Sequence, residues 1–156
     1  PESWRTPMTT ANSTERQSVR EGVAQGSVMI AYEWQPFGVM TLDGEGRLSF
    51  PAAPKTPAIY RFNLPDGEYI GEAANLRRRF NGYRNPAAGQ QTNVRMNPVL
   101  RAAVPDATID VVEGATITVA GVEHRLDLTS KSARLLVENA AITLANVDSV
   151  KLRNLQ

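Results

Sequence analysis

The sequence predicts an α+β domain with a small mixed or antiparallel central sheet, flanked by helices and preceded by a β-hairpin extension. Short segments rich in branched and aromatic residues lie between turn residues, which is typical of strands. Other segments carry apolar residues at three- and four-residue intervals, which predicts helices. The two kinds of segment do not alternate regularly, so a Rossmann fold is not expected. The 156 residues, 42% of them apolar, are enough for one such core.

The N-terminal third is predicted to be an accessory element. Its first 25 residues are polar and contain one candidate for a short helix, at residues 13–23. Three later segments are rich in branched or aromatic residues and are expected to be strands: Val28–Trp34, Val39–Leu42 and Arg47–Phe50. The Asp43-Gly-Glu-Gly turn between the last two predicts a hairpin.

Three prolines mark the expected start of the main domain. Pro51, Pro54 and Pro57 cannot continue a helix and favour an extended link. We therefore expect the accessory element at residues 1–54 and the main domain at residues 55–156.

The main domain begins with a predicted hairpin. Residues 58–62 and 68–71 are strand-like and are joined by the turn Leu64-Pro-Asp-Gly. Apolar residues then recur at helical intervals over residues 72–83, which predicts a helix. The remaining elements are expected in this order: a helix at 93–103, strands at 108–112, 116–119 and 122–128, and a helix at 131–146 capped by Thr129 or Ser130.

Charge is unevenly distributed along the chain. The net charge is +1, yet residues 55–104 contain eight Lys or Arg against three acids, a net of +5. Between Ala73 and Pro105 there are six arginines and no acid. Such a stretch predicts a surface that faces phosphates, and the alternative is a solvated helix face.

Composition excludes several classes of protein. The chain has no cysteine, which excludes a disulfide framework and cysteine-bound zinc. Its apolar segments fall far short of the roughly 20 residues that cross a bilayer, and Pro1–Arg20 is too polar for a signal peptide. We expect no membrane association and a cytoplasmic location. His124, the only histidine, and the two tryptophans are expected to be structural.

An ordered set of motifs in the main domain resembles the GIY-YIG nucleases. Ala58-Ile-Tyr60 is similar to the GIY segment, Tyr69-Ile-Gly71 to the YIG segment, and Asn75-Leu-Arg-Arg-Arg79 to the N-L-x-x-R segment. Residues 134–142 are similar to the late helix in which a glutamate binds the metal. The family includes the incision subunit of bacterial excision repair and several restriction enzymes. The resemblance runs from Ala58 to Asn146 with its parts in order, which is more specific than any single tripeptide.

This resemblance implies hydrolysis of phosphodiester bonds with one Mg²⁺ or Mn²⁺ ion per active site. Tyr60 would activate or orient the attacking water, with Tyr69 hydrogen-bonding nearby. Arg79 would hold the scissile phosphate in bidentate fashion. Glu138 would bind the ion, and Tyr83 would support the phosphate or the water. A base role for Tyr60 requires that Arg79 or the metal lowers its pKa, because a free tyrosine has a pKa of about 10.

Further residues are expected to assist. The supporting positions are Gly71, Asn75 and Asn139, the last of which would orient Glu138. The expected DNA contacts are Arg77, Arg78, Arg84, Asn93, Arg95 and Arg101. Each residue also has a structural alternative, since tyrosines pack in hairpins and arginines or a glutamate are common on solvated helices. Glu138 is the hardest to explain in that way, because its helix neighbours are mostly apolar.

The sequence departs from the family pattern in two places. Ala58 replaces the usual first glycine, which an ordinary strand conformation tolerates. Glu72 stands where many relatives have lysine, which removes a cation near the phosphate. Arg77 or Arg78 is expected to compensate.

The expected function is a metal-dependent DNA endonuclease of restriction or free-standing type. One alternative is a nuclease domain of a larger DNA repair, mobile-element or antiviral protein. An alternative of another class is a DNA-binding module that has lost cleavage, whose binding would need no metal and would fall steeply with salt. A homodimer would be required to cut both strands of a duplex simply, because one chain carries one such site.

Overall fold

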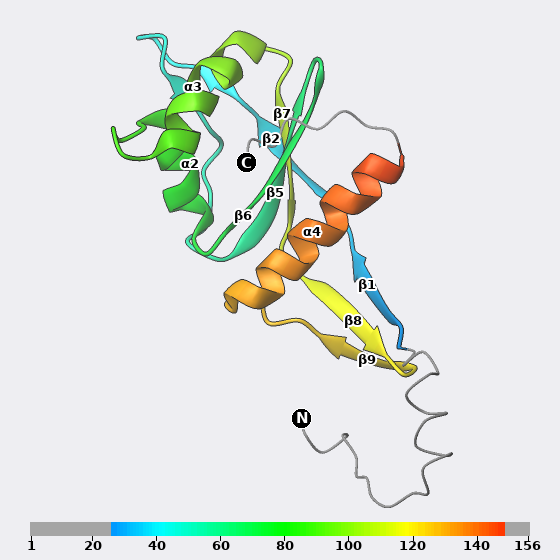
Figure 1. Ribbon diagram of the computed structural model, residues 1–156. Coiled ribbons are helices and arrows are strands. Elements are labelled where there is room, and N and C mark those ends of the chain that lie inside the picture. Colours follow the sequence, from blue (N-terminus) through cyan, green and yellow to red (C-terminus); the bar gives the residue numbers. More distant parts are fainter. Residues whose placement is uncertain (1–25, 149–156) are drawn as a thin grey trace, which may run out of the picture.

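The structure, a computed structural model, describes residues 26–148 (Figure 1). The predicted helix at residues 13–23 and Trp4 lie outside the described residues. The helices are α2 (Leu76–Arg84), α3 (Gln91–Ala103) and α4 (Lys131–Val147). The strands are β1 (Val28–Tyr32), β2 (Gln35–Val39), β3 (Thr41–Leu42), β4 (Leu48–Ser49), β5 (Ala58–Leu64), β6 (Gly67–Ala73), β7 (Thr108–Val112), β8 (Ala115–Val119) and β9 (Val122–Arg125).

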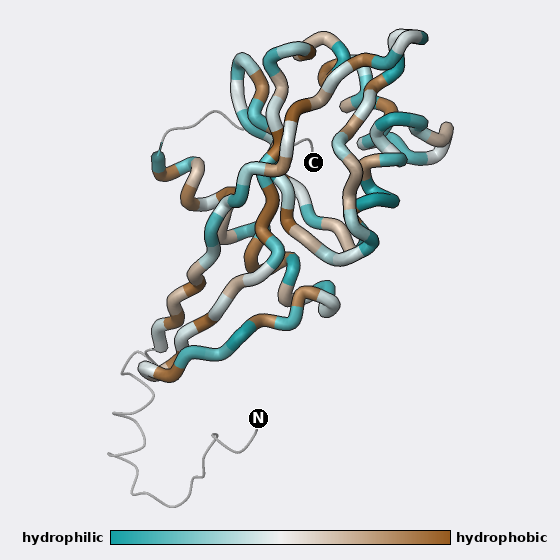
Figure 2. Tube along the Cα trace, turned by 180° about the vertical axis from the view of Figure 1, so that it is seen from behind, coloured by the Kyte–Doolittle hydropathy of each residue, from teal (hydrophilic) through white to brown (hydrophobic). Residues whose placement is uncertain are grey.

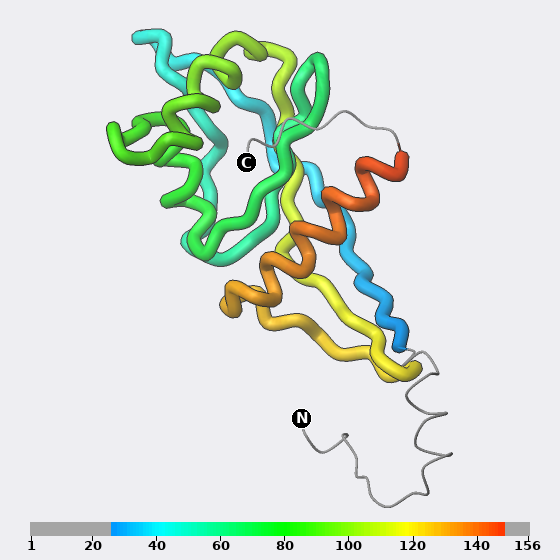
Figure 3. Tube along the Cα trace, in the orientation of Figure 1, coloured from blue at the N-terminus to red at the C-terminus, as the bar shows by residue number. Residues whose placement is uncertain are grey.

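The strands form two larger sheets and a two-stranded one of β3 and β4, and all strand pairs are antiparallel. The largest one, called the central sheet below, has four strands in the order β2-β7-β5-β6. The outer sheet has the order β1-β8-β9 and projects away from the rest of the molecule (Figures 1 and 3). The predicted α+β class with an antiparallel central sheet is confirmed.

The N-terminal segment contributes to both sheets. The strand predicted at Val28–Trp34 ends at Tyr32, and β1 pairs with β8. A further strand, β2, pairs with β7 at the edge of the central sheet, with a register shift between Pro36 and Gly38. A proline is compatible with this position because an edge strand has one row of unpaired N–H groups. The predicted division between residues 1–54 and 55–156 stays a prediction.

The predicted hairpins are present. Strands β3 and β4 pair as Thr41 with Ser49 and Leu42 with Leu48, and the Asp43 carboxylate accepts hydrogen bonds from the backbone N–H groups of Glu45 and Arg47. Strands β5 and β6 pair along their whole length. This second hairpin places β6 at the other edge of the central sheet.

Helices cover the central sheet on both faces (Figures 1 and 3). Alternate residues of β5 point to opposite faces: Tyr60 and Phe62 join a core with residues of α2 and α3, whereas Ile59 joins a second core with Val137 and Ala141 of α4. Figure 2 shows that most of α2 is hydrophilic, in keeping with its arginines. None of the helices among residues 26–148 has the length and apolar character for a bilayer crossing.

The predicted start of the first helix is wrong. Strand β6 continues through Glu72 to Ala73, and α2 begins only at Leu76. Asn75 caps the helix, since its side-chain oxygen accepts from Arg78 N at 3.0 Å. An apolar Ala73 fits both the core face of a strand and a helical stripe, so the periodicity did not distinguish the two.

The other helices lie close to their predicted positions. Helix α3 begins at Gln91, two residues before the expected start, and α4 begins at Lys131 with Ser130 as its cap. The last predicted strand is shorter than expected, because β9 ends at Arg125.

Candidate active site

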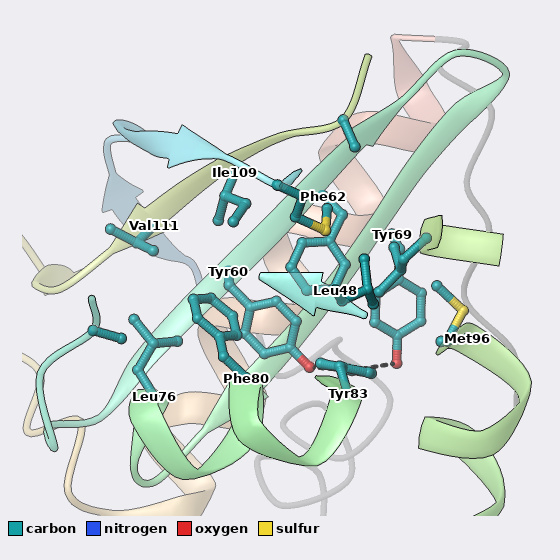
Figure 4. Packing of buried hydrophobic residues seen from close by; sticks show 14 of the residues in the cluster. Leu48, Tyr60, Phe62, Tyr69, Leu76, Phe80, Tyr83, Met96, Ile109 and Val111 are labelled. Atoms are coloured by element: carbon teal, nitrogen blue, oxygen red, sulfur yellow. Dashed lines mark hydrogen bonds between the residues drawn. The ribbon is translucent and has the colours of Figure 1, made fainter. Parts of the chain in front are cut away.

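Three tyrosines meet in the core between the central sheet and α2 (Figure 4). Tyr60 of β5 and Tyr83 of α2 are hydrogen-bonded through their hydroxyl oxygens, which lie 2.6 Å apart. The Tyr83 hydroxyl also lies 3.5 Å from that of Tyr69 on β6, a weak contact. All three side chains are buried. The structure thus brings together the predicted tyrosines from two strands and a helix.

Gly71 makes room for the ring of Tyr60. The two residues are direct neighbours across β5 and β6, and a Cβ atom on Gly71 would overlap with the hydroxyl end of Tyr60. The ring therefore lies across the edge strand and carries the hydroxyl toward the border of the sheet. The glycine of the YIG segment has a steric role here.

Burial keeps Tyr60 and Tyr83 protonated. Desolvation raises the pKa of Tyr60 well above 10, and the nearby Tyr69 adds to this, whereas Arg79 and the hydrogen bond with Tyr83 act in the opposite direction. Burial likewise raises the pKa of Tyr83. At neutral pH both groups are phenols, so Tyr60 acts as a neutral hydroxyl in this state.

Arg79 is a half-buried guanidinium beside the tyrosines. Burial lowers its pKa, but the acidic groups of Tyr60, Tyr83, Glu72 and Tyr69 outweigh that effect and raise it. Within residues 26–148, no carboxylate lies within ion-pair distance of Arg79 and no hydrogen bond engages its side chain. A half-buried cation without such a partner favours the binding of an anion.

A hollow of about 250 Å³ lies beside Arg79, between α2 and the start of α3. Its polar lining consists of Asn75, Arg78, Arg79, Gln90 and Asn93, and Gly82 leaves space next to Asn93. We call it the α2–α3 hollow. Two guanidinium groups and three amides are suited to phosphate and to polar ligand edges.

Glu138 approaches the same region from the opposite face of the central sheet. It lies on α4 and is half-buried. Desolvation and then the neighbouring Glu72 raise the pKa of Glu138, whereas Arg79 and Lys131 lower it. No hydrogen bond to its carboxylate is present within residues 26–148. A partly desolvated carboxylate without a donor fits a hard cation, because Mg²⁺ takes one or two protein carboxylates and keeps several waters.

The described residues contain no cluster of three or more His, Cys, Asp and Glu side chains that could hold a metal. Any ion bound at Glu138 would therefore take most of its ligands from water and substrate, as Mg²⁺ does in phosphate-binding enzymes.

Glu72 forms an ion pair that was not predicted. Its Oε1 accepts from Arg134 Nε at 2.6 Å, and the side chains are only 13% and 7% exposed. Arg134 also donates to the backbone oxygens of Leu128 and Thr129. The residue that replaces the usual lysine thus joins β6 to α4 one turn before Glu138, and the expected loss of a cation near the phosphate stays a prediction. The only hint of this ion pair in the sequence is Arg134 itself, an arginine among the apolar residues of the helix, four residues before Glu138.

The remaining predicted DNA contacts lie in different surroundings. Arg78 lines the α2–α3 hollow, and Asn93 is buried there with 7% exposure. Arg77 donates to the backbone oxygen of Ala53 at 2.8 Å, and Arg84 pairs with Asp43 at 2.8 Å. Arg95 and Arg101 are exposed on α3 and do not line the hollow.

Two other expectations concern single polar residues. Asn139 is exposed, and within residues 26–148 its side chain makes no hydrogen bond to Glu138. His124 is exposed on β9, opposite Ile117, outside the cluster of tyrosines.

Comparisons with known proteins bear on the fold. No protein-family model matches the chain, and no curated protein matches it. Among solved structures, the chain is similar to a mutant of bacteriophage T4 EndoII, with a TM-score of 0.52, 20% identity, and coverage of 72% of this chain and 88% of the other. EndoII is a GIY-YIG endonuclease. At this level of identity the similarity establishes the fold. The matched part of the chain therefore shares its fold with EndoII, a GIY-YIG endonuclease.

Proposed function

We propose that this protein is a metal-dependent endonuclease of restriction or free-standing type that hydrolyses phosphodiester bonds in DNA. The main support is Arg79, a half-buried guanidinium without an ion-pair partner in residues 26–148 that borders both the tyrosines and a hollow. The fold shared with EndoII supports the same class of enzyme.

Arg79 binds the scissile phosphate. A planar guanidinium holds two phosphate oxygens at once, and the half-buried position strengthens this interaction relative to bulk water. The guanidinium then stabilises the negative charge that grows on the phosphate in the transition state.

Tyr60 orients the attacking water through its hydroxyl. Its raised pKa opposes a role as an ionised base. Because the Tyr83 hydroxyl donates toward Tyr69, the Tyr60 hydroxyl donates to Tyr83 across the 2.6 Å contact, and a lone pair of Tyr60 Oη remains to accept a hydrogen bond from a water. Tyr83 thereby fixes the direction in which the Tyr60 hydroxyl points.

Glu138 holds one Mg²⁺ or Mn²⁺ ion through its carboxylate oxygens. The support is its half-buried position, where no donor among residues 26–148 satisfies it. When bound, such an ion stabilises negative charge on the leaving oxygen. Arg134 positions the chain around Glu138, because it ties α4 to Glu72 and to the backbone before the helix.

The substrate is assigned as DNA from the basic stretch that contains α2 and α3. Residues between Ala73 and Pro105 include six arginines and no acid, and counterion release from phosphates would give such a surface its affinity. Double-strand cutting requires a second copy, since each chain carries one site.

A plasmid-nicking assay with Mg²⁺, Mn²⁺ or EDTA tests the proposal. The native chain is compared with Arg79→Ala and with Arg125→Ala, an exposed arginine on β9, at matched DNA occupancy. Nicking that requires metal, survives in Arg125→Ala and falls by about a hundred- to a thousandfold in Arg79→Ala is expected. Tight binding with no cutting under any metal would favour the DNA-binding module instead.

A further inference from the structure

The α2–α3 hollow is larger than a phosphate group requires. Its volume is about 250 Å³, and a water molecule in the liquid takes about 30 Å³. A phosphate held by Arg79 and Arg78 therefore leaves part of the hollow open. The open part is bordered by the amides of Gln90 and Asn93.

The two amides are held in one orientation. Asn93 Nδ2 donates to Gln90 Oε1 at 2.9 Å, and the backbone N–H of Ala87 donates to the same oxygen at 3.3 Å. Because a backbone N–H must meet an oxygen, the contact from Ala87 determines which atom of Gln90 faces it. That choice in turn requires the nitrogen of Asn93 to face Gln90.

One donor and one acceptor remain. Within residues 26–148, no hydrogen bond engages Gln90 Nε2 or Asn93 Oδ1. Asn93 is only 7% exposed although it lines the hollow, so a ligand in the hollow can reach its amide without first displacing a protein partner of the oxygen. These two groups belong to side chains that are joined by a hydrogen bond, and a donor and an acceptor on such a pair are the groups that complement a base edge with a ring nitrogen next to an amino group.

Gly82 keeps this end of the hollow open. It follows Arg79 by three residues on α2, so the two lie on the same face of the helix. A Cβ atom on residue 82 would lie 2.8 Å from Asn93 Nδ2 and 3.9 Å from Gln90 Oε1. A larger residue would therefore displace the amide pair or fill the space that it borders.

We infer that the α2–α3 hollow is a specificity subsite for the nucleobase next to the phosphate bound by Arg79. The base carries an amino group beside a ring-nitrogen acceptor, as adenine and cytosine do. Gln90 Nε2 donates to the ring nitrogen and Asn93 Oδ1 accepts from the amino group. The inference rests on the proposed nuclease function, and it requires that the base leaves the stack to enter the hollow.

Cleavage of a DNA library with randomised positions tests the subsite. The total amount cut reports the nuclease function, and the base frequencies around the cut report the subsite. The native chain is expected to favour adenine or cytosine about tenfold at one position beside the cut, as one bidentate contact would give. Replacing adenine at that position with its analogue lacking ring nitrogen N7 shows which edge is bound.

Matched variants locate the preference. Gln90→Ala and Gly82→Ala should reduce it to near onefold, whereas Gln91→Ala, an exposed neighbour that does not line the hollow, should retain it. Cutting by the native chain without any base preference, or a preference that persists in Gln90→Ala, would overturn the subsite and leave the nuclease function intact.

A binding selection covers the case in which no library member is cut. The same library is selected for binding in EDTA and sequenced. Enrichment of adenine or cytosine at one position that depends on Gln90 would support the subsite although the nuclease function had failed. Binding without such enrichment would overturn the subsite as well.

Discussion

The two faces of the central sheet are built from different kinds of side chain. The side toward α2 and α3, called the aromatic face, packs Tyr60, Phe62 and Tyr69 of the sheet against Phe80 and Tyr83 of α2. The side toward α4, called the aliphatic face, packs Ile59, Ile70 and Val112 of the sheet against Val137 and Ala141 of α4, with Tyr32 and Trp34 partly buried beside them. The aromatic face gathers hydroxyl groups in its interior, whereas the aliphatic face carries the Glu72–Arg134 and Arg61–Asp110 ion pairs and the Glu138 carboxylate.

Strand β6 contributes side chains to both faces. It is an edge strand, with Tyr69 and Gly71 directed to the aromatic face and Glu72 to α4. The electrostatic influence of Arg79 on Glu138 crosses this edge. The difference between the faces teaches that the positions of the tyrosines and Arg79 depend on aromatic packing, whereas the position of Glu138 depends on the Glu72–Arg134 ion pair that ties its helix to the sheet.

The largest expected effect on stability comes from breaking the Glu72–Arg134 ion pair on the α4 side of the sheet. Glu72→Lys restores the residue that many GIY-YIG relatives carry, but it places a second cation against Arg134, which is 7% exposed. Urea denaturation should show a loss of about 3–5 kcal/mol in the free energy of unfolding. Glu72→Gln, which keeps a hydrogen-bond acceptor, should lose less. A stable Glu72→Lys protein that cuts faster than the native chain would contradict the role given to Arg134.

Gly71→Ala tests the aromatic face. The added methyl group would overlap with Tyr60, so the ring must shift and the Tyr60–Tyr83 contact must lengthen. Overpacking of this kind costs about 1–3 kcal/mol, which thermal unfolding can measure. Gly44→Ala, where a Cβ atom meets nothing within 4 Å, is the matched control and should cost less than about 1 kcal/mol.

Alkaline titration should distinguish the tyrosines from free tyrosine. Tyr60 and Tyr83 have pKa values raised above the ordinary 10.0 by burial. As pH rises past 10, the unfolded chain therefore releases these protons before the folded chain does, so stability is retained below that pH and falls above it. When tyrosinate absorbance is recorded at stepwise increasing pH, the native chain should show a late component, rising together with unfolding, that is absent from Tyr60→Phe/Tyr83→Phe. Full ionisation of the folded protein near pH 10 would show that the cluster is open to water.

The smallest effect on stability is expected at Glu138. Its pKa is raised from 4.5, so above that pH the ionised carboxylate lowers the stability of the folded state relative to the unfolded chain. At neutral pH the free energy of unfolding of Glu138→Gln should therefore exceed that of the native chain, by less than about 1 kcal/mol after solvent screening. Thermal unfolding should show this as a slightly higher melting temperature. The difference should disappear at a pH well below 4.5. A destabilised Glu138→Gln protein would indicate a structural role for the carboxylate.

Much of the fold followed from local sequence patterns. Strands β5 and β7 and helix α4 were predicted closely because their apolar spacing and capping residues agree. The position of β2 was not predicted, since its pairing with β7 joins residues far apart in the chain and leaves no local signal. The start of α2 was missed because Ala73 suits both a strand and a helix.

The candidate site likewise has residues that the sequence predicted and contacts that it did not. Tyr60, Tyr69 and Tyr83 were expected together, and the resemblance to GIY-YIG nucleases supplied Arg79 and Glu138. The Glu72–Arg134 ion pair and the amide pair of Gln90 and Asn93 depend on contacts between separate elements. Periodicity alone does not give such contacts, because it identifies the face of an element and not its neighbour.

A double-mutant cycle between the two halves of the site tests the central claim most directly. The single-turnover rate of plasmid nicking with Mn²⁺ is measured for the native chain, Arg79→Ala, Glu138→Gln and the double variant. If both halves form one active site, each single change should slow nicking by about a hundredfold or more. The double variant should then be no slower than the slower single variant, because residues that act as a unit are not additive. Nicking by Glu138→Gln at the native rate, or losses that multiply in the double variant, would contradict a single site built from both faces.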